Sequence, residues 1–190
     1  MSTRHDDLRS TAVRAARWTI VEKWGSRLMS MLVFSILARY VAPGDFGLLA
    51  MAAVVLAFLA VFVDSGFART LVQQKRIDDL DVTTAFWTSV GLSVLAYVAV
   101  YVAAPLVEAL YDAPGLADVL RVMAISVVLA GLSGVPAALL EREFKFRGLS
   151  LRVLAGTAGG GLIGVTAALS GAGVWALVAQ TVSSQAISLV

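Results

Sequence analysis

A basic pair near the start of the first long apolar segment, Lys23 and Arg27, consists of residue types that could bind an anion. The two residues are four positions apart, so a helix places both on one face, with Ser30 close to the same stripe. Two cations on a polar stripe could line a cavity that receives an anionic group. Alternatively, both cations lie in the lipid headgroup layer beside Trp18 and Trp24, because basic residues and tryptophans commonly anchor the ends of membrane helices.

Two further polar series repeat every four residues inside apolar segments. One series comprises Ser89, Ser93, Tyr97 and Tyr101, and the other comprises Gln180, Ser184 and Ser188. On a helix each series forms a polar face. Such a face either lines a wet cavity, where it could meet sugar hydroxyl groups, or forms hydrogen bonds to a neighbouring helix.

Acidic residues give weaker candidates. Asp64 is expected at the end of the second apolar segment and is either a proton or ion ligand or an interfacial acid near Arg69. The motif RIDDLD at 76–81 resembles half of a magnesium–diphosphate site, but no second acidic cluster accompanies it, and magnesium needs several convergent oxygens. The chain has no cysteine and one histidine, His5, so we predict no metal site and no cofactor.

The elements that must position these residues follow from the apolar composition. Hydrophobic residues make up 59% of the 190 residues and the mean hydropathy is +0.85, whereas soluble domains are about 45–50% apolar. Uncharged runs approach or exceed the roughly 20 residues that cross a bilayer. We therefore predict an all-α, polytopic membrane helix bundle of about six transmembrane helices. The expected spans are 18–41, 46–68, 83–107, 119–140, 151–170 and 174–190, after a polar tail at 1–17.

Several small residues and prolines refine this prediction. Gly156, Gly160 and Gly164 form two overlapping GxxxG patterns, which predict a close helix contact. Pro136 is expected to kink the fourth span, and Pro105 to break the helix at the end of the third. The sixth apolar segment has no cap or flank at residue 190, so the chain is expected to be a fragment of a longer protein, truncated in its sixth helix.

The basic residues predict the orientation of the bundle. Four arginines precede residue 18, three cations lie at 69–76 and four at 142–152, whereas only Arg39 and Arg121 lie on the opposite side. Cytoplasmic segments are enriched in lysine and arginine, so the N-terminus is expected in the cytoplasm. Because the charges lie between apolar blocks, the net charge of +2 does not indicate nucleic acid. The basic-aromatic stretch EREFKFRGLSLR is better explained as an amphipathic linker on anionic lipid.

Four stretches in this order resemble the polysaccharide-transporter family. They are ILARYVAPGDFGLLAMAAVV, FVDSGFARTLVQ, ALLEREFKFRGLSLR and GAGVWALVAQ. The family includes Wzx-type O-antigen and exopolysaccharide flippases and the colanic acid exporter group, within the MATE-like superfamily. The resemblance begins near Trp18 and covers most of the chain. It implies that this chain is the N-terminal half of a MATE-like fold, whose partner is the missing C-terminal bundle of the same protein.

The resemblance also implies a function. Such proteins flip an undecaprenyl-diphosphate-linked oligosaccharide across the bacterial inner membrane by alternating access, for polysaccharide or lipopolysaccharide biosynthesis. The substrate is not changed covalently, so no enzyme activity is expected. Lys23 and Arg27 would meet the diphosphate, the polar faces would meet the sugars, and the lipid tail would stay among the membrane lipids.

Two alternatives remain. A MATE-type drug or metabolite exporter would favour acidic residues deep in the membrane, which the apolar segments lack away from their ends. A structural membrane protein without transport would tolerate neutral substitutions at Lys23 and Arg27.

Overall fold

The computed structural model describes residues 2–63, 79–142 and 146–189, and every regular element within these ranges is a helix. The helices are α1 (Ser2–Tyr40), α2 (Pro43–Val63), α4 (Asp79–Tyr111), α5 (Leu116–Met123), α6 (Ile125–Arg142), α7 (Phe146–Leu169) and α8 (Val174–Leu189). The predicted all-α class is confirmed.

Four stretches of the described residues are long and apolar enough to cross a membrane. They are Pro43–Ala60, Val82–Tyr111, Leu116–Leu140 and Gly148–Leu169. Only 11–33% of each stretch is buried inside the bundle, so most of the apolar surface faces outward. A surface of this kind is stable in lipid rather than in water. The protein is therefore a multi-pass membrane protein, and the division into six spans stays a prediction.

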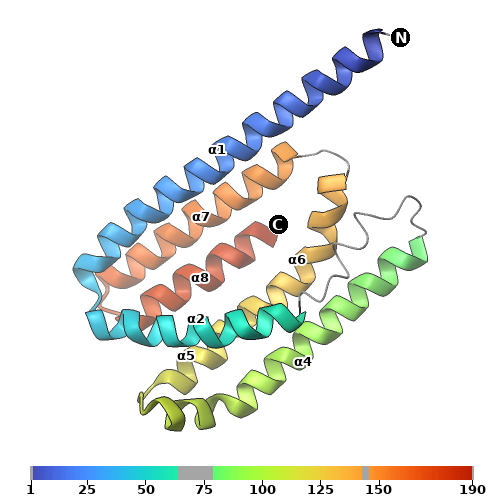
Figure 1. The fold of residues 1–190 in the computed structure, drawn as a ribbon. Helices are drawn as coiled ribbons and strands as arrows, with labels where there is room; N and C mark the ends of the chain where they lie inside the picture. Colours follow the sequence, from blue (N-terminus) through green and yellow to red (C-terminus); the bar gives the residue numbers. More distant parts are fainter. Residues whose placement is uncertain (1, 64–78, 143–145, 190) are drawn as a thin grey trace.

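Successive helices alternate in direction, except that α6 continues in the direction of α5, and the turns named next gather at one end of the bundle (Figure 1). These are the turns between α1 and α2, between α4 and α5, and between α7 and α8. A Cβ atom added at Gly173 would lie 3.1 Å from Asp45 Oδ2, so two of the turns are in contact. Gly173 has a φ of 56°, a left-handed conformation that glycine adopts without steric cost.

The expected fourth span consists of two helices, because the chain changes from α5 to α6 at Ala124. Glu108 on α4 stabilises the start of α5, since its Oε2 accepts a 2.7 Å hydrogen bond from the Ala117 N–H. Pro105 was expected to break the preceding helix, and this prediction is wrong because α4 continues to Tyr111. A proline removes a single helical hydrogen bond, which a long membrane helix tolerates.

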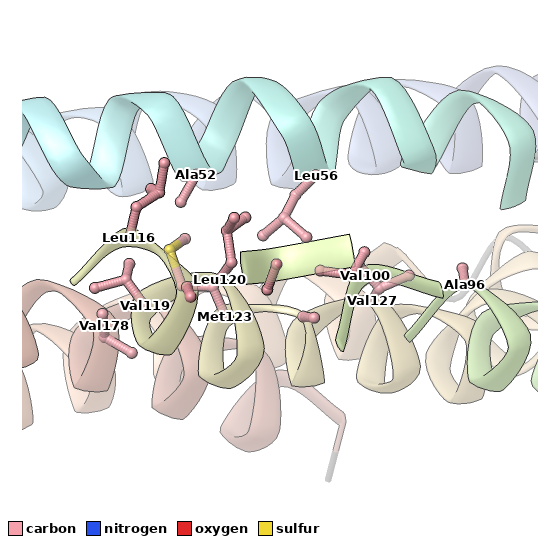
Figure 2. Packing of buried hydrophobic residues seen from close by; sticks show 13 residues of the cluster. Ala52, Leu56, Ala96, Val100, Leu116, Val119, Leu120, Met123, Val127 and Val178 are labelled. Carbon is pink, nitrogen blue, oxygen red and sulfur yellow. The ribbon is translucent and has the colours of Figure 1, made fainter. Parts of the chain in front are cut away.

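Two main hydrophobic clusters hold the described helices together, and Ala85 of α4 with Val135 of α6 forms a further small one. Figure 2 shows the larger cluster, in which Leu116, Leu120 and Met123 of α5 lie against Ala52 and Leu56 of α2. The smaller cluster joins Val33 and Leu37 of α1 to Ala168 of α7 and Ala176 and Leu177 of α8. Val178 of α8 belongs to the larger cluster, so α8 contributes side chains to both clusters and connects the helices that form them.

The predicted close helix contact lies between α7 and α8. A Cβ atom added at Gly160 would lie 2.6 Å from Ser184 Cβ and 2.7 Å from the Gln180 carbonyl oxygen. Gly156 and Gly164 face Ser188 and Gln180 in the same way. Another glycine of α7, Gly161, faces Val33 of α1, so α7 lies between α1 and α8 (Figure 1). The three helices can approach closely because these positions carry no side chain.

Candidate functional site

A polar cavity of about 790 Å³, here called the central cavity, lies where α1, α4, α6, α7 and α8 meet. Its polar lining residues are Ser30, Ser133, Arg152, Thr157, Gln180, Thr181, Ser184, Gln185 and Ser188. The hydroxyl groups of Ser133, Thr157, Thr181 and Ser188 donate hydrogen bonds to carbonyl oxygens of their own helices. Their lone pairs and the other polar groups of the lining can bind water or a polar ligand.

The sequence-predicted series on α8 forms one wall of the central cavity. Gln180 and Ser184 line it together with Ser30 of α1. The same two α8 residues also contact Gly164 and Gly160 of α7. The glycines therefore bring the backbone of α8 against α7 and thereby position its polar side chains at the cavity. The two alternatives for this series, cavity lining and helix packing, both apply.

The predicted series on α4 has a different position. Ser93 is fully buried, and a Cβ atom added at Gly131 of α6 would lie 2.6 Å from Ser93 Cβ. The Ser93 hydroxyl donates a 2.8 Å hydrogen bond to the Val90 carbonyl oxygen of its own helix. This corrects the expectation that Ser93 lines the cavity, because a serine held between two helices cannot reach a ligand.

The other three members of the α4 series, Ser89, Tyr97 and Tyr101, are also absent from the lining of the central cavity. The Ser89 carbonyl oxygen lies in the same α4–α6 contact. Tyr97 packs against the larger hydrophobic cluster, and its ring centroid lies 6.1 Å from that of Tyr101. The α4 residue that does reach the cavity is Phe86. The spacing of the series identified a shared helix face correctly, but that face meets α6 and the core.

The predicted basic pair lies on exposed parts of α1. Lys23 and Arg27 line a side pocket of about 630 Å³ together with Ser26 and Ser30. Ser30 and Val153 belong to both the side pocket and the central cavity, so the two spaces adjoin. The basic pair is therefore placed beside the cavity and not within it. Whether it binds a ligand or anchors the helix stays a prediction.

A side-chain hydrogen bond joins α1 to α7 at this pocket. The buried Ser150 hydroxyl of α7 donates a 2.7 Å hydrogen bond to Glu22 Oε2 of α1. The neighbouring Ser26 hydroxyl is buried and has no hydrogen-bonding partner within the described residues. A bond to a carboxylate is stronger than one between neutral groups, so the Glu22–Ser150 contact helps to hold this part of α1 against α7.

Arg152 is a cavity residue that reasoning from the sequence missed. Its partly buried side chain lines the central cavity, whereas the sequence analysis places it in the basic connection between spans. The sequence does contain a pattern that could have identified it, because the four-residue spacing of Gly156, Gly160 and Gly164 extends back to Arg152. Arg152 therefore belongs to the face of α7 that meets α8. A guanidinium group there can bind a phosphate through two parallel hydrogen bonds.

Pro136 interrupts the hydrogen bonding of α6 at the wall of the central cavity. It lies inside α6 and lacks an N–H, so the Leu132 carbonyl oxygen cannot receive its usual helical hydrogen bond. Leu132 and Pro136 both line the cavity.

The structure describes only some of the acidic candidate residues. Asp64 and residues 76–78 of the RIDDLD motif lie outside the described residues. Within the described ranges, no group of three or more histidine, cysteine, aspartate or glutamate residues could hold a metal ion.

Outward-facing apolar helices beside an open cavity lined by hydroxyl, amide and guanidinium groups define a multi-pass helical membrane protein with a partly polar cavity. Comparison with known proteins identifies the group. A family model described as polysaccharide biosynthesis protein matches residues 36–190, and the chain belongs to this family.

Curated relatives come from several bacteria. The chain is 30% identical over 179 residues to the succinoglycan biosynthesis transport protein ExoT of Rhizobium meliloti, which covers 94% of this chain and 36% of that protein. It is 26% identical over 144 residues to the lipopolysaccharide biosynthesis protein WzxC of Escherichia coli, covering 76% of this chain and 29% of the relative. The teichuronic acid biosynthesis protein TuaB of Bacillus subtilis is 22% identical over 135 residues, covering 71% and 28%.

The chain thus spans about a third of the length of the curated relatives it matches. No solved structure matches it significantly.

Proposed function

We propose that this chain forms part of a transporter that flips a lipid-diphosphate-linked oligosaccharide across the bacterial inner membrane for polysaccharide biosynthesis. The N-terminus lies in the cytoplasm, and the bundle opens the cavity alternately to the two sides. The names of the relatives support this, since one is a succinoglycan biosynthesis transport protein and another a lipopolysaccharide biosynthesis protein. The oligosaccharide crosses chemically unchanged, and no cofactor takes part.

The central cavity is the observation that carries the proposal. An oligosaccharide cannot cross about 30 Å of hydrocarbon unless its hydroxyl groups keep hydrogen-bonding partners. The α8 wall offers such partners in the side chains of Gln180, Thr181, Ser184 and Gln185. Arg152 supplies a positive charge for the diphosphate in the same space.

The charge of the lining favours this function over the export of cationic drugs. A drug exporter of the MATE type is expected to use deep acidic residues, whereas the described residues that line the central cavity include no aspartate or glutamate. A purely structural membrane protein has no need for a polar cavity of this size, because unfilled polar space lowers stability.

The test replaces Arg152 with glutamine in the intact gene, expressed in its own bacterium after deletion of the chromosomal copy. We expect surface polysaccharide to fall about tenfold or more, because a hydrogen bond to a charged group contributes about 1.5–3 kcal/mol. The lipid-linked oligosaccharide should accumulate in the cytoplasmic leaflet while the amount of membrane protein stays normal.

Arg39→Gln is the matched control, since Arg39 is exposed at the end of α1 and lines none of the cavities described above. This variant should export polysaccharide at the normal level. If Arg152→Gln exports as much polysaccharide as Arg39→Gln, the cavity does not bind the diphosphate and the proposal fails.

A further inference from the structure

A second, largely apolar groove lies between α1, α2 and α8, next to the central cavity. Its volume is about 730 Å³. Its apolar lining residues are Trp24, Leu28, Met31, Phe34, Leu37, Phe46, Leu49 and Leu177, and its polar ones are Arg27, Ser30 and Gln180. Apart from the buried Leu37, the apolar α1 side chains are strongly exposed, with 68% of Trp24 and 59% of Leu28 accessible. Large apolar side chains that line a groove and lack neighbours suit an apolar ligand.

The groove has the length and polarity of a site for one hydrocarbon chain. From Trp24 to Leu37 the helix rises about 20 Å, at 1.5 Å per residue, which is about two thirds of the hydrocarbon thickness of a bilayer. The rings of Phe34 and Phe46 meet edge to face near its far end, with centroids 5.4 Å apart. Among the described residues, Arg27 is the only charged one that lines the groove, and it lies toward the opposite end.

The groove and the central cavity meet at two residues. Ser30 and Gln180 line both spaces, and Arg27 lines both the groove and the side pocket. A molecule with a polar head, a phosphate and a single apolar tail therefore fits this arrangement in one order. The head occupies the central cavity, the phosphate lies near Arg27 and Ser30, and the tail follows the groove.

We infer that the groove binds the phosphate-proximal part of the polyprenyl tail of the lipid-linked substrate, an inference that rests on the proposed function. The tail is then held by α1, α2 and α8 while the head crosses, and does not remain wholly among the membrane lipids. An ordinary phospholipid fits less well, because it has two chains and its headgroup would leave most of the adjoining 790 Å³ cavity unfilled.

Photo-cross-linking in membrane vesicles tests the inference. The photoreactive residue p-benzoylphenylalanine replaces Leu28, which lines the groove, or Leu32, which does not. Both positions are leucines of α1 with similar exposure, 59% and 64%, so Leu32 is a matched control for contact with bulk lipid. The probe is undecaprenyl-diphosphate N-acetylglucosamine with tritium in the sugar, in phosphatidylethanolamine and phosphatidylglycerol vesicles.

We expect several-fold stronger labelling at position 28 than at position 32. Unlabelled undecaprenyl phosphate should abolish this labelling, an equal excess of dioleoyl phosphatidic acid should not, and Arg27→Gln should weaken it. Equal labelling at the two positions, or equal competition by phosphatidic acid, would overturn the inference.

A third photoreactive position, Ser184 in the central cavity, separates this inference from the proposed function. Labelling at position 184 without labelling at position 28 refutes the groove but supports the function. If position 184 is not labelled either, both the inference and the proposed function fail.

Discussion

At the scale of single residues, the polar side chains divide according to what lies opposite them. Ser93 and Ser184 each belong to a series of polar residues that repeats every four positions on an apolar helix. Ser93 is enclosed by Gly131, whereas Ser184 lies beside Gly160 and also reaches the central cavity. Periodicity shows which residues share a helix face, but not which neighbour that face meets. This is why the α8 series lines the central cavity and the α4 series does not, although both show the same spacing; that the α8 residues bind a substrate stays a prediction.

Arg152 shows that the sequence can also miss a residue that lines the cavity. Reasoning from charge placed it with the basic residues of a connection between spans, because basic residues flank membrane helices. The helix α7 begins at Phe146, so Arg152 already lies in its second turn and on the face that meets α8. The helix start, which could not be read from the sequence, decides the role of this side chain.

The basic pair on α1 gives a prediction at this scale. Arg27 lines the apolar groove as well as the side pocket, whereas Lys23 lines the side pocket alone. We therefore expect Arg27→Gln to reduce polysaccharide export about tenfold, since a hydrogen bond to a charged group contributes about 1.5–3 kcal/mol, and Lys23→Gln to have a smaller effect. The measurement is surface polysaccharide per unit of membrane protein. Equal, small effects of the two variants would instead support a role as headgroup anchors.

At the scale of helices, the contact between α7 and α8 positions the cavity wall. The sequence predicted this contact from the GxxxG patterns, because small residues allow helix backbones to approach. It could not identify α8 as the partner, since the pattern carries no information about the opposite surface. The break between α5 and α6 was also not predictable, because it falls at Ala124, within an uncharged run at residues 122–140.

A substitution in this contact should destabilise the bundle. We expect Gly160→Ala to lower the free energy of unfolding by about 1–3 kcal/mol, the usual cost of overpacking, because the added methyl group meets the backbone of α8. Thermal unfolding of the purified protein in detergent measures the effect.

Gly91→Ala is the control for this substitution. Gly91 lies within α4, and a Cβ atom added there meets nothing within 4 Å. Alanine favours a helix more than glycine by up to about 1 kcal/mol, so this variant should unfold at the same temperature or higher. If both variants are equally stable, the α7–α8 backbones are farther apart than described.

At the scale of the whole molecule, α8 joins two groups of helices through its residues in both hydrophobic clusters. The central cavity lies where α4 and α6 meet α1, α7 and α8. The fold class was predictable, because long uncharged segments have few stable arrangements other than membrane helices. The position of the cavity was not, because it depends on how the two groups meet. The expectation that a second bundle completes the transporter stays a prediction.

The most direct test of the central claim asks whether the central cavity is wet and accepts the substrate. The chain has no cysteine, so Ser184→Cys introduces a single thiol into the cavity wall. Val102→Cys is the control, since Val102 is 72% exposed on the apolar surface of α4 and lies at a similar distance from the same end of the bundle. A charged, water-soluble thiol reagent reacts with the thiolate and therefore only where water is present.

Cysteine at position 184 should react, cysteine at position 102 should not, and undecaprenyl-diphosphate-linked oligosaccharide should protect position 184. Failure of position 184 to react, or reaction at the same rate with and without the lipid-linked oligosaccharide, would contradict the account.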